Sequence, residues 1–194
     1  MKKFNHFLML VSGILTFSTV IAQKDSSGIY NTAADFMQGK LSYAINYKTE
    51  KHKINGDMIF NDREIKVKHA GKKYTLQKND TYGYRSTMGK DFRFVDNKEY
   101  KILNTGEPLL IYVYQHQSHS PKEAQKYAPM YFFSVDAASE PQPLRKSNVK
   151  AAFPDNHKFH DALDAQFKED MELYAYDSFH KIYKLNRILQ NSMK

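Results

Sequence analysis

The sequence predicts an α+β protein: an antiparallel β-meander or partial barrel with a short N-terminal helix and a C-terminal helical segment packed on it. Between residues 41 and 135, short runs of β-branched and aromatic residues alternate with turn residues. After residue 145, apolar residues recur at steps of three or four, which is typical of amphipathic helices. We therefore divide the chain into a leader (1–22), a mainly β part with a short N-terminal helix (23–144) and a helical segment of the same domain (145–194).

The leader has the pattern of a secretory signal peptide. Lys2 and Lys3 precede an uncharged, mostly apolar run from Phe7 to Ala22. A membrane-spanning helix needs roughly 18 to 20 apolar residues, and this run is shorter and diluted by Ser, Thr and Gly. We expect cleavage after Ala22 and export to the periplasm or the medium. The alternative is an uncleaved membrane anchor.

The chain has no cysteine and no tryptophan. Disulfide bonds, thiol nucleophiles, cysteine metal ligands and lipid attachment through a cysteine are therefore excluded. The 14 tyrosines and 13 phenylalanines must supply much of the core. Aromatic residues at alternating positions are typical of sheets.

The first elements follow a polar lead-in at residues 23–28. In "TAADFMQGK" we expect a short helix with Thr32 as its N-cap, Asp35 in a capping-box position and Gly39 at its end. The next stretch, "LSYAINY", alternates apolar and polar residues and predicts a half-buried strand.

A series of hairpins is predicted next, after a short strand "MIF" at 58–60. The expected strand pairs are "EIKVKH" with "KYTLQ", "TYGYRS" with "DFRFV", and "EYKIL" with "LLIYVY". Each pair is joined through a glycine, which adopts a positive φ without strain: Gly71, Gly89 and Gly106. A last strand, "MYFFSV", stands between two polar linkers, 115–129 and 136–147. In the second linker, prolines argue against regular structure.

The C-terminal part predicts a short helix capped by Ser147 and ending at Ala152, before Pro154. Asp155 or Asn156 would cap the next helix. From Phe159 to Leu189 an apolar stripe predicts one helix, or two with a break near 168–170. We expect the stripe to pack on the sheet. The alternative is that it packs against a helix of a partner protein.

Positive charge is concentrated in one stretch. Residues 40–78 hold ten Lys or Arg against four Asp or Glu. Lys66 and Lys68 alternate with apolar residues and so share the outer face of a strand. Together with Lys72 and Lys73 they form a candidate polyanion-binding face, for an anionic glycan, a cell-surface polymer or a protein partner. Export argues against nucleic acid, and the alternative is a strand whose lysines only prevent aggregation.

A candidate metal site lies in "PDNHKFHDALDAQF". On a helix, His157, His160 and Asp164 cluster on the side away from the apolar stripe, and zinc binds such ligands. The alternative is a solvated face supported by i,i+4 His–Asp pairs. The sequence holds no G-x-S-x-G, H-E-x-x-H, P-loop or dinucleotide motif, so no catalytic residue is assigned.

These features leave two hypotheses of function. The first is a non-enzymatic binding or structural module with a basic β face. The second is a metal-binding protein or metal-dependent hydrolase that uses the histidine helix.

One resemblance bears on the β region. The stretches "GIYNTAADFMQGKL" (28–41) and "YGYRSTMGKDFRFVDNKEYKIL" (82–103) carry a T-x-x-D-F helix followed by Y-G-Y and F-R-F strands. This pattern resembles small exported proteins of Bacteroidota-type bacteria. The resemblance covers roughly 28–114 and implies an exported, β-rich protein; it brings no catalytic residue to this chain.

Overall fold

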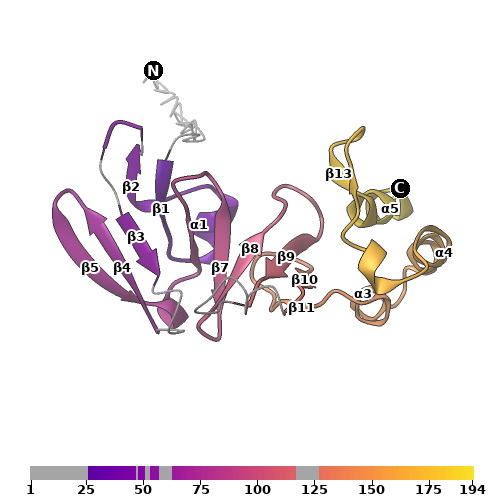
Figure 1. The fold of residues 1–194 in the computed structure, drawn as a ribbon. Coiled ribbons are helices and arrows are strands. Elements are labelled where there is room, and N and C mark those ends of the chain that lie inside the picture. Colours follow the sequence, from indigo (N-terminus) through magenta and orange to yellow (C-terminus); the bar gives the residue numbers. More distant parts are fainter. Residues whose placement is uncertain (1–25, 47, 51–52, 57–62, 117–126) are drawn as a thin grey trace, which may run out of the picture.

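The protein has an α+β fold of antiparallel sheets with a few short helices (Figure 1). This computed structural model describes residues 26–46, 48–50, 53–56, 63–116 and 127–194. The predicted signal peptide, the strand "MIF" and most of the linker 115–129 lie outside the described residues.

Eight strands form one open antiparallel sheet, whose two outer strands lie at opposite ends and do not close it into a barrel. In sheet order they are β11 (Gln142–Pro143), β10 (Met130–Ser134), β9 (Leu110–Tyr114), β8 (Lys98–Ile102), β7 (Asp91–Val95), β6 (Gly83–Arg85), β1 (Ser26–Tyr30) and β2 (Ser42–Asn46). The predicted hairpins β6–β7 and β8–β9 are confirmed, and Gly89 and Gly106 in their loops have φ of 68° and 75°.

A separate three-stranded sheet holds β3 (Lys53–Gly56), β4 (Glu64–His69) and β5 (Lys72–Gln77), followed by the 3₁₀ turn η1 (Lys78–Asp80). The β4–β5 hairpin is confirmed, and its turn residues Ala70 and Gly71 both have positive φ. The prediction that these strands continue one meander was wrong. Strand β6 is paired with β7 on one side and β1 on the other, so β5 has no place beside it.

Strand β1 is one of the elements that the sequence did not predict. Its five residues are all buried, although 23–28 reads as a polar lead-in. The small side chains of Ser27 and Gly28 let β2 approach, because a Cβ on Gly28 would lie 2.8 Å from the carbonyl oxygen of Ser42. Small residues at a close strand contact give no apolar signal, and the strand was therefore not recognised.

One face of the large sheet is covered by helix α1 (Ala33–Met37). Thr32 and Asp35 form the capping box at its start, each side chain accepting a hydrogen bond from the other residue's backbone N–H. Phe36 stacks on Tyr82, with ring centroids 5.3 Å apart, and meets Tyr30 edge-on. This cluster also includes the buried side chains of Tyr100, Ile102, Leu110 and Tyr112.

The opposite face is covered by two different elements, one at each end (Figure 1). At the β1–β6–β7 end, Ile65 and Val67 of the three-stranded sheet pack on Ile29, Tyr84 and Phe94. At the β9–β10 end, the C-terminal segment packs on Leu109, Ile111 and Phe133.

The C-terminal segment consists of α3 (Lys146–Ala152), α4 (His157–Gln166), η2 (Asp170–Glu172), the hairpin β12 (Tyr176–Asp177) and β13 (Ile182–Tyr183), and α5 (Lys184–Ser192). Asn156 caps α4 as predicted, by accepting from the N–H of Phe159 at 3.0 Å. The N-cap of α3 is Arg145 and not Ser147.

Two further predictions need correction. The stripe from Phe159 to Leu189 is not continuous helix, because a 3₁₀ turn and a hairpin separate α4 from α5. Within the second linker, Gln142 and Pro143 form the edge strand β11 on β10. An edge strand tolerates proline, since the missing N–H would face away from the sheet.

Candidate functional site

The basic face is the outer surface of the three-stranded sheet, and its geometry follows from the strand register. Lys68 of β4 is directly opposite Lys73 of β5, and on the other side the register pairs it with Lys53 of β3. Lys66, two residues before Lys68, is opposite Thr75. Directly opposite residues on neighbouring strands have Cβ atoms about 4.5–5.5 Å apart. Lys68 and Lys73 therefore lie side by side on two neighbouring strands, and Lys66 precedes Lys68 on the same face of β4.

Lys72 does not belong to this face. It is opposite His69, which alternates with the buried Ile65 and Val67 and so lies on the other side of β4. We define the basic face as Lys66, Lys68 and Lys73.

In the part of the chain that the structure describes, no acidic side chain pairs with the lysines of this face. Lys66, Lys68 and Lys73 are exposed, and within the described part of the chain none of them forms a hydrogen bond or an ion pair. The acid that shares their side of β4 is Glu64, whose Oε1 accepts from the amide of Gln77 at 3.3 Å. Like charges directly opposite each other destabilise a sheet. A bound anion would remove that repulsion.

The candidate metal ligands serve a different purpose. Nε2 of His160 lies 2.9 Å from the carbonyl oxygen of Phe153 and 3.2 Å from that of Lys150. Because carbonyl oxygens only accept, this nitrogen carries a proton and offers no lone pair to a metal. Asp164 is held by the ammonium groups of Lys146 and Lys150, which lower the pKa of its carboxyl group.

Through these contacts, the polar side of α4 that carries His160 and Asp164 packs against α3, and we call this contact the α3–α4 seam. The ring centroids of His157 and His160 are 6.0 Å apart, and His157 is exposed. Among the residues that the structure describes, no group of three or more His, Cys, Asp or Glu side chains could hold a metal ion. The structure therefore does not bring His157, His160 and Asp164 together as a ligand set.

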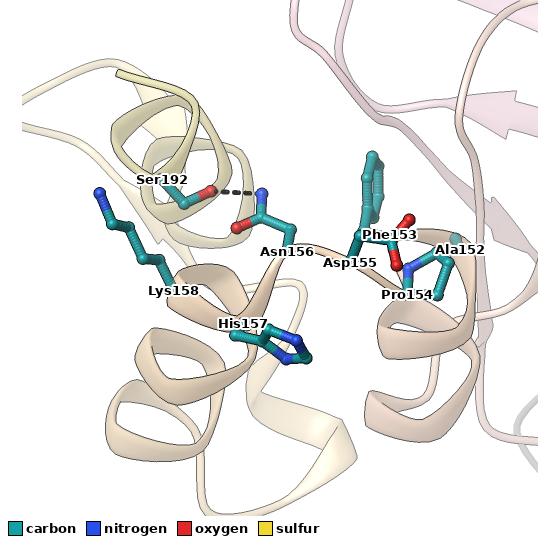
Figure 2. Close-up of a pocket in the computed structure, with 8 residues that line it drawn as sticks. All are labelled: Ala152, Phe153, Pro154, Asp155, Asn156, His157, Lys158 and Ser192. Atoms are coloured by element: carbon teal, nitrogen blue, oxygen red, sulfur yellow. Dashed lines mark hydrogen bonds between the residues drawn. The ribbon is translucent and has the colours of Figure 1, made fainter.

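A wide hollow of about 710 Å³ opens beside this seam, lined by residues 152–158 and Ser192 (Figure 2). The amide of Asn156 donates to the hydroxyl of Ser192 at 2.9 Å, so both polar groups are used in joining α4 to α5. The hollow is open to solvent, and His157 and Lys158 at its side are exposed. In a small-molecule site a few polar groups point at the same place, and the polar groups that line this hollow do not.

A buried polar cluster on the α1 face was not predicted. The hydroxyl of Tyr30 donates to Asp91 at 2.9 Å, and Arg85 binds the same carboxylate through two nitrogens at 2.8 and 3.0 Å. Burial and the neighbouring carboxylate raise the pKa of Tyr30, which stays a neutral donor. Both oxygens of Asp91 are used internally, so the cluster joins β1, β6 and β7. These residues come together only through the order of the strands.

Comparisons with protein-family models, with curated proteins and with solved structures give no match to this chain. Within the described residues, no helix is both long and apolar enough to cross a membrane.

Proposed function

We propose that this protein is an exported binding module that holds an anionic glycan or cell-surface polymer on its basic face. The observation that carries the proposal is the gathering of the exposed Lys66, Lys68 and Lys73 on one face of the β4–β5 hairpin, with Lys68 directly opposite Lys73. The signal-peptide pattern of residues 1–22 supports the proposal that the protein is exported.

The spacing of the lysines suits a charged polymer. Neighbouring strands are about 4.8 Å apart and alternate residues along a strand about 6.7 Å apart. Lysines on such a grid present several cations to successive acidic groups of one chain. A lysine ammonium is a flexible point charge without a fixed donor geometry, which favours recognition of charge density over recognition of one small anion.

The proposal is tested with the chain from residue 23, which contains every described element. We expect this protein to bind dextran sulfate but not uncharged dextran, and to be released by salt because exposed charges are screened. Replacing Lys66, Lys68 and Lys73 by glutamine should weaken binding at least about tenfold, since each cation near a polyanion contributes a fraction of a kcal/mol or more.

Two controls separate this face from net charge. Glutamine at Lys90, Lys98 and Lys158 removes the same charge from exposed positions elsewhere. Glutamine at Lys72 removes a charge from the same hairpin but from the other side of β4. The triple control is compared with glutamine at Lys66, Lys68 and Lys73, and glutamine at Lys72 is compared with glutamine at Lys73 alone. If either control weakens binding as much as the variant it is compared with, net charge and not the face is responsible, and the proposal fails.

A further inference from the structure

The hairpin β12–β13 holds a large apolar side chain away from the protein. Phe179, in the loop between the two strands, is 87% exposed. It contacts the ring of His180 edge-on at 4.9 Å between centroids. The hairpin stands out from the C-terminal helices (Figure 1). Exposing a phenylalanine in water is unfavourable, and a partner that covers it would recover that free energy.

The loop is built to hold this position. Oδ1 of Asp177 accepts from the backbone N–H groups of Phe179 at 3.1 Å and His180 at 3.0 Å. Its other oxygen binds Nδ1 of His180 at 2.8 Å and the guanidinium of Arg187 at 2.9 Å. Lys181 closes the loop in the left-handed region, with φ of 55°. The turn that carries Phe179 is therefore fixed by hydrogen bonds and ion pairs of Asp177.

Two lysines follow Phe179 closely in the chain. Lys181 is exposed and Lys184 begins α5, while the charge of Asp177 is already neutralised by Arg187. The acids of the preceding turn η2 are held by backbone groups: Asp170 accepts from the N–H of Lys146, and Glu172 from that of Lys168. On the stem of the hairpin, Tyr176 is half exposed and packs edge-on against Tyr183.

An aromatic tip, a tyrosine on the stem and lysines beside them are the side chains that a bilayer interface favours. Aromatic residues partition to the level of the headgroups, and cations near the surface are attracted to anionic lipid. We propose that the β12–β13 hairpin is a membrane-contact element. In this arrangement Phe179 inserts into the headgroup region of an anionic lipid bilayer, and Lys181 and Lys184 bind lipid phosphates.

The absence of tryptophan from the chain gives a direct test. In the chain from residue 23, Phe179→Trp creates a single tryptophan at the tip, which can be excited apart from the tyrosines. On vesicles of phosphatidylglycerol and phosphatidylcholine we expect its emission to shift to the blue and to be quenched by brominated lipid. Met88→Trp, at the turn of β6–β7 where the side chain is 73% exposed, should show neither effect.

Association measured by vesicle sedimentation completes the test. Phe179→Ser should weaken it at least about tenfold, as expected when one aromatic side chain no longer leaves water. Lys181→Gln with Lys184→Gln should weaken it on anionic vesicles and leave the weaker association with pure phosphatidylcholine unchanged. No blue shift of the tip tryptophan at low salt, or equal association of Phe179→Ser and the parent protein, would overturn the inference.

This test is independent of the basic face. Glutamine at Lys66, Lys68 and Lys73 should leave the blue shift of the tip tryptophan intact. If it abolishes vesicle association instead, lipid is bound by the basic face and the inference about the hairpin fails, while binding of dextran sulfate through that face stands.

Discussion

At the scale of single residues, Glu99 is a carboxyl group in an unfavourable position. It lies on the face of β8 that the three-stranded sheet covers, where the hydroxyl of Tyr84 donates to it at 2.9 Å. Burial raises the pKa of Glu99, against the opposing influence of Tyr84 and Lys78. The folded protein thus binds this proton more tightly than the unfolded chain. Its free energy of unfolding falls as the pH rises from the ordinary carboxyl pKa through the raised one.

Replacing Glu99 by glutamine tests this sign. The amide oxygen still accepts from Tyr84, but no charge is buried. We expect the variant to be more stable than the parent at neutral pH, and the difference to vanish below the ordinary carboxyl pKa, where Glu99 is protonated in both states. Urea unfolding across this pH range measures it. A variant that is less stable at neutral pH would show that attraction by Lys78 outweighs burial.

Asn186 is a second residue whose role is specific. It is fully buried in α5; its amide oxygen accepts from the N–H of Leu109 at 2.7 Å, and its nitrogen lies 2.6 Å from Oε2 of Glu107. Asn186→Ala leaves a buried N–H without a partner, so we expect a loss of about 2–3 kcal/mol in the free energy of unfolding. Asn191→Ala, exposed on the same helix, should change it by less than about 0.5 kcal/mol.

At the scale of elements, the sequence predicts what local chemistry decides. The hairpins were found because glycine at Gly71, Gly89 and Gly106 allows the positive φ that their turns use. Strand β1 was missed because its signal is the absence of side chains. The separation of β3–β5 from the main sheet depends on β1 pairing with β6, which no local pattern contains.

The stripe from Phe159 to Leu189 shows a second limit. Leu173 is as buried as Leu163 and Leu185, although it lies outside any α-helix. Glu169 with Glu172 forms a capping box on η2, and Asp177 caps its own turn. Acidic side chains that bind nearby backbone N–H groups offer the chain an alternative to helix. The spacing of the apolar residues correctly indicated that Leu163 and Leu185 are buried, but it wrongly indicated that the chain between α4 and α5 is helical.

The helix pair α3–α4 gives a prediction about the histidines. Because His160 donates to carbonyl groups at the end of α3, His160→Ala should lower the free energy of unfolding by about 1 kcal/mol. His157→Ala, at an exposed position, should have little effect. Neither zinc nor a chelator should move the melting temperature. A rise of several degrees with zinc that His160→Ala abolishes would restore the metal hypothesis.

At the scale of the whole molecule, the large sheet is covered at its β9–β10 end by the C-terminal segment. The cluster under the C-terminal segment joins Leu109, Ile111 and Phe133 of the sheet to Phe159 and Leu185 of the helices. Removing the helices would expose three fully buried or nearly fully buried side chains of the sheet, each of which contributes roughly 1.5–3 kcal/mol when buried. Together they amount to about 4.5–9 kcal/mol, which is most or all of the stability of a domain in the lower half of the ordinary range of about 5–15 kcal/mol.

We therefore expect the chain from residue 23 to 194 to unfold in one cooperative transition, seen by calorimetry and by circular dichroism at the same temperature. The shorter chain 23–144 should show no cooperative transition and should bind a hydrophobic dye. The residues substituted in the binding tests, on the basic face and at the tip of the hairpin, are exposed and lie outside the shared core. Variants at Lys68 or Phe179 should melt with the parent protein, so a loss of binding in them reports the surface and not the fold. Two separate transitions for the chain 23–194, or a cooperative one for the chain 23–144, would show that the sheet is stable without its helical cover.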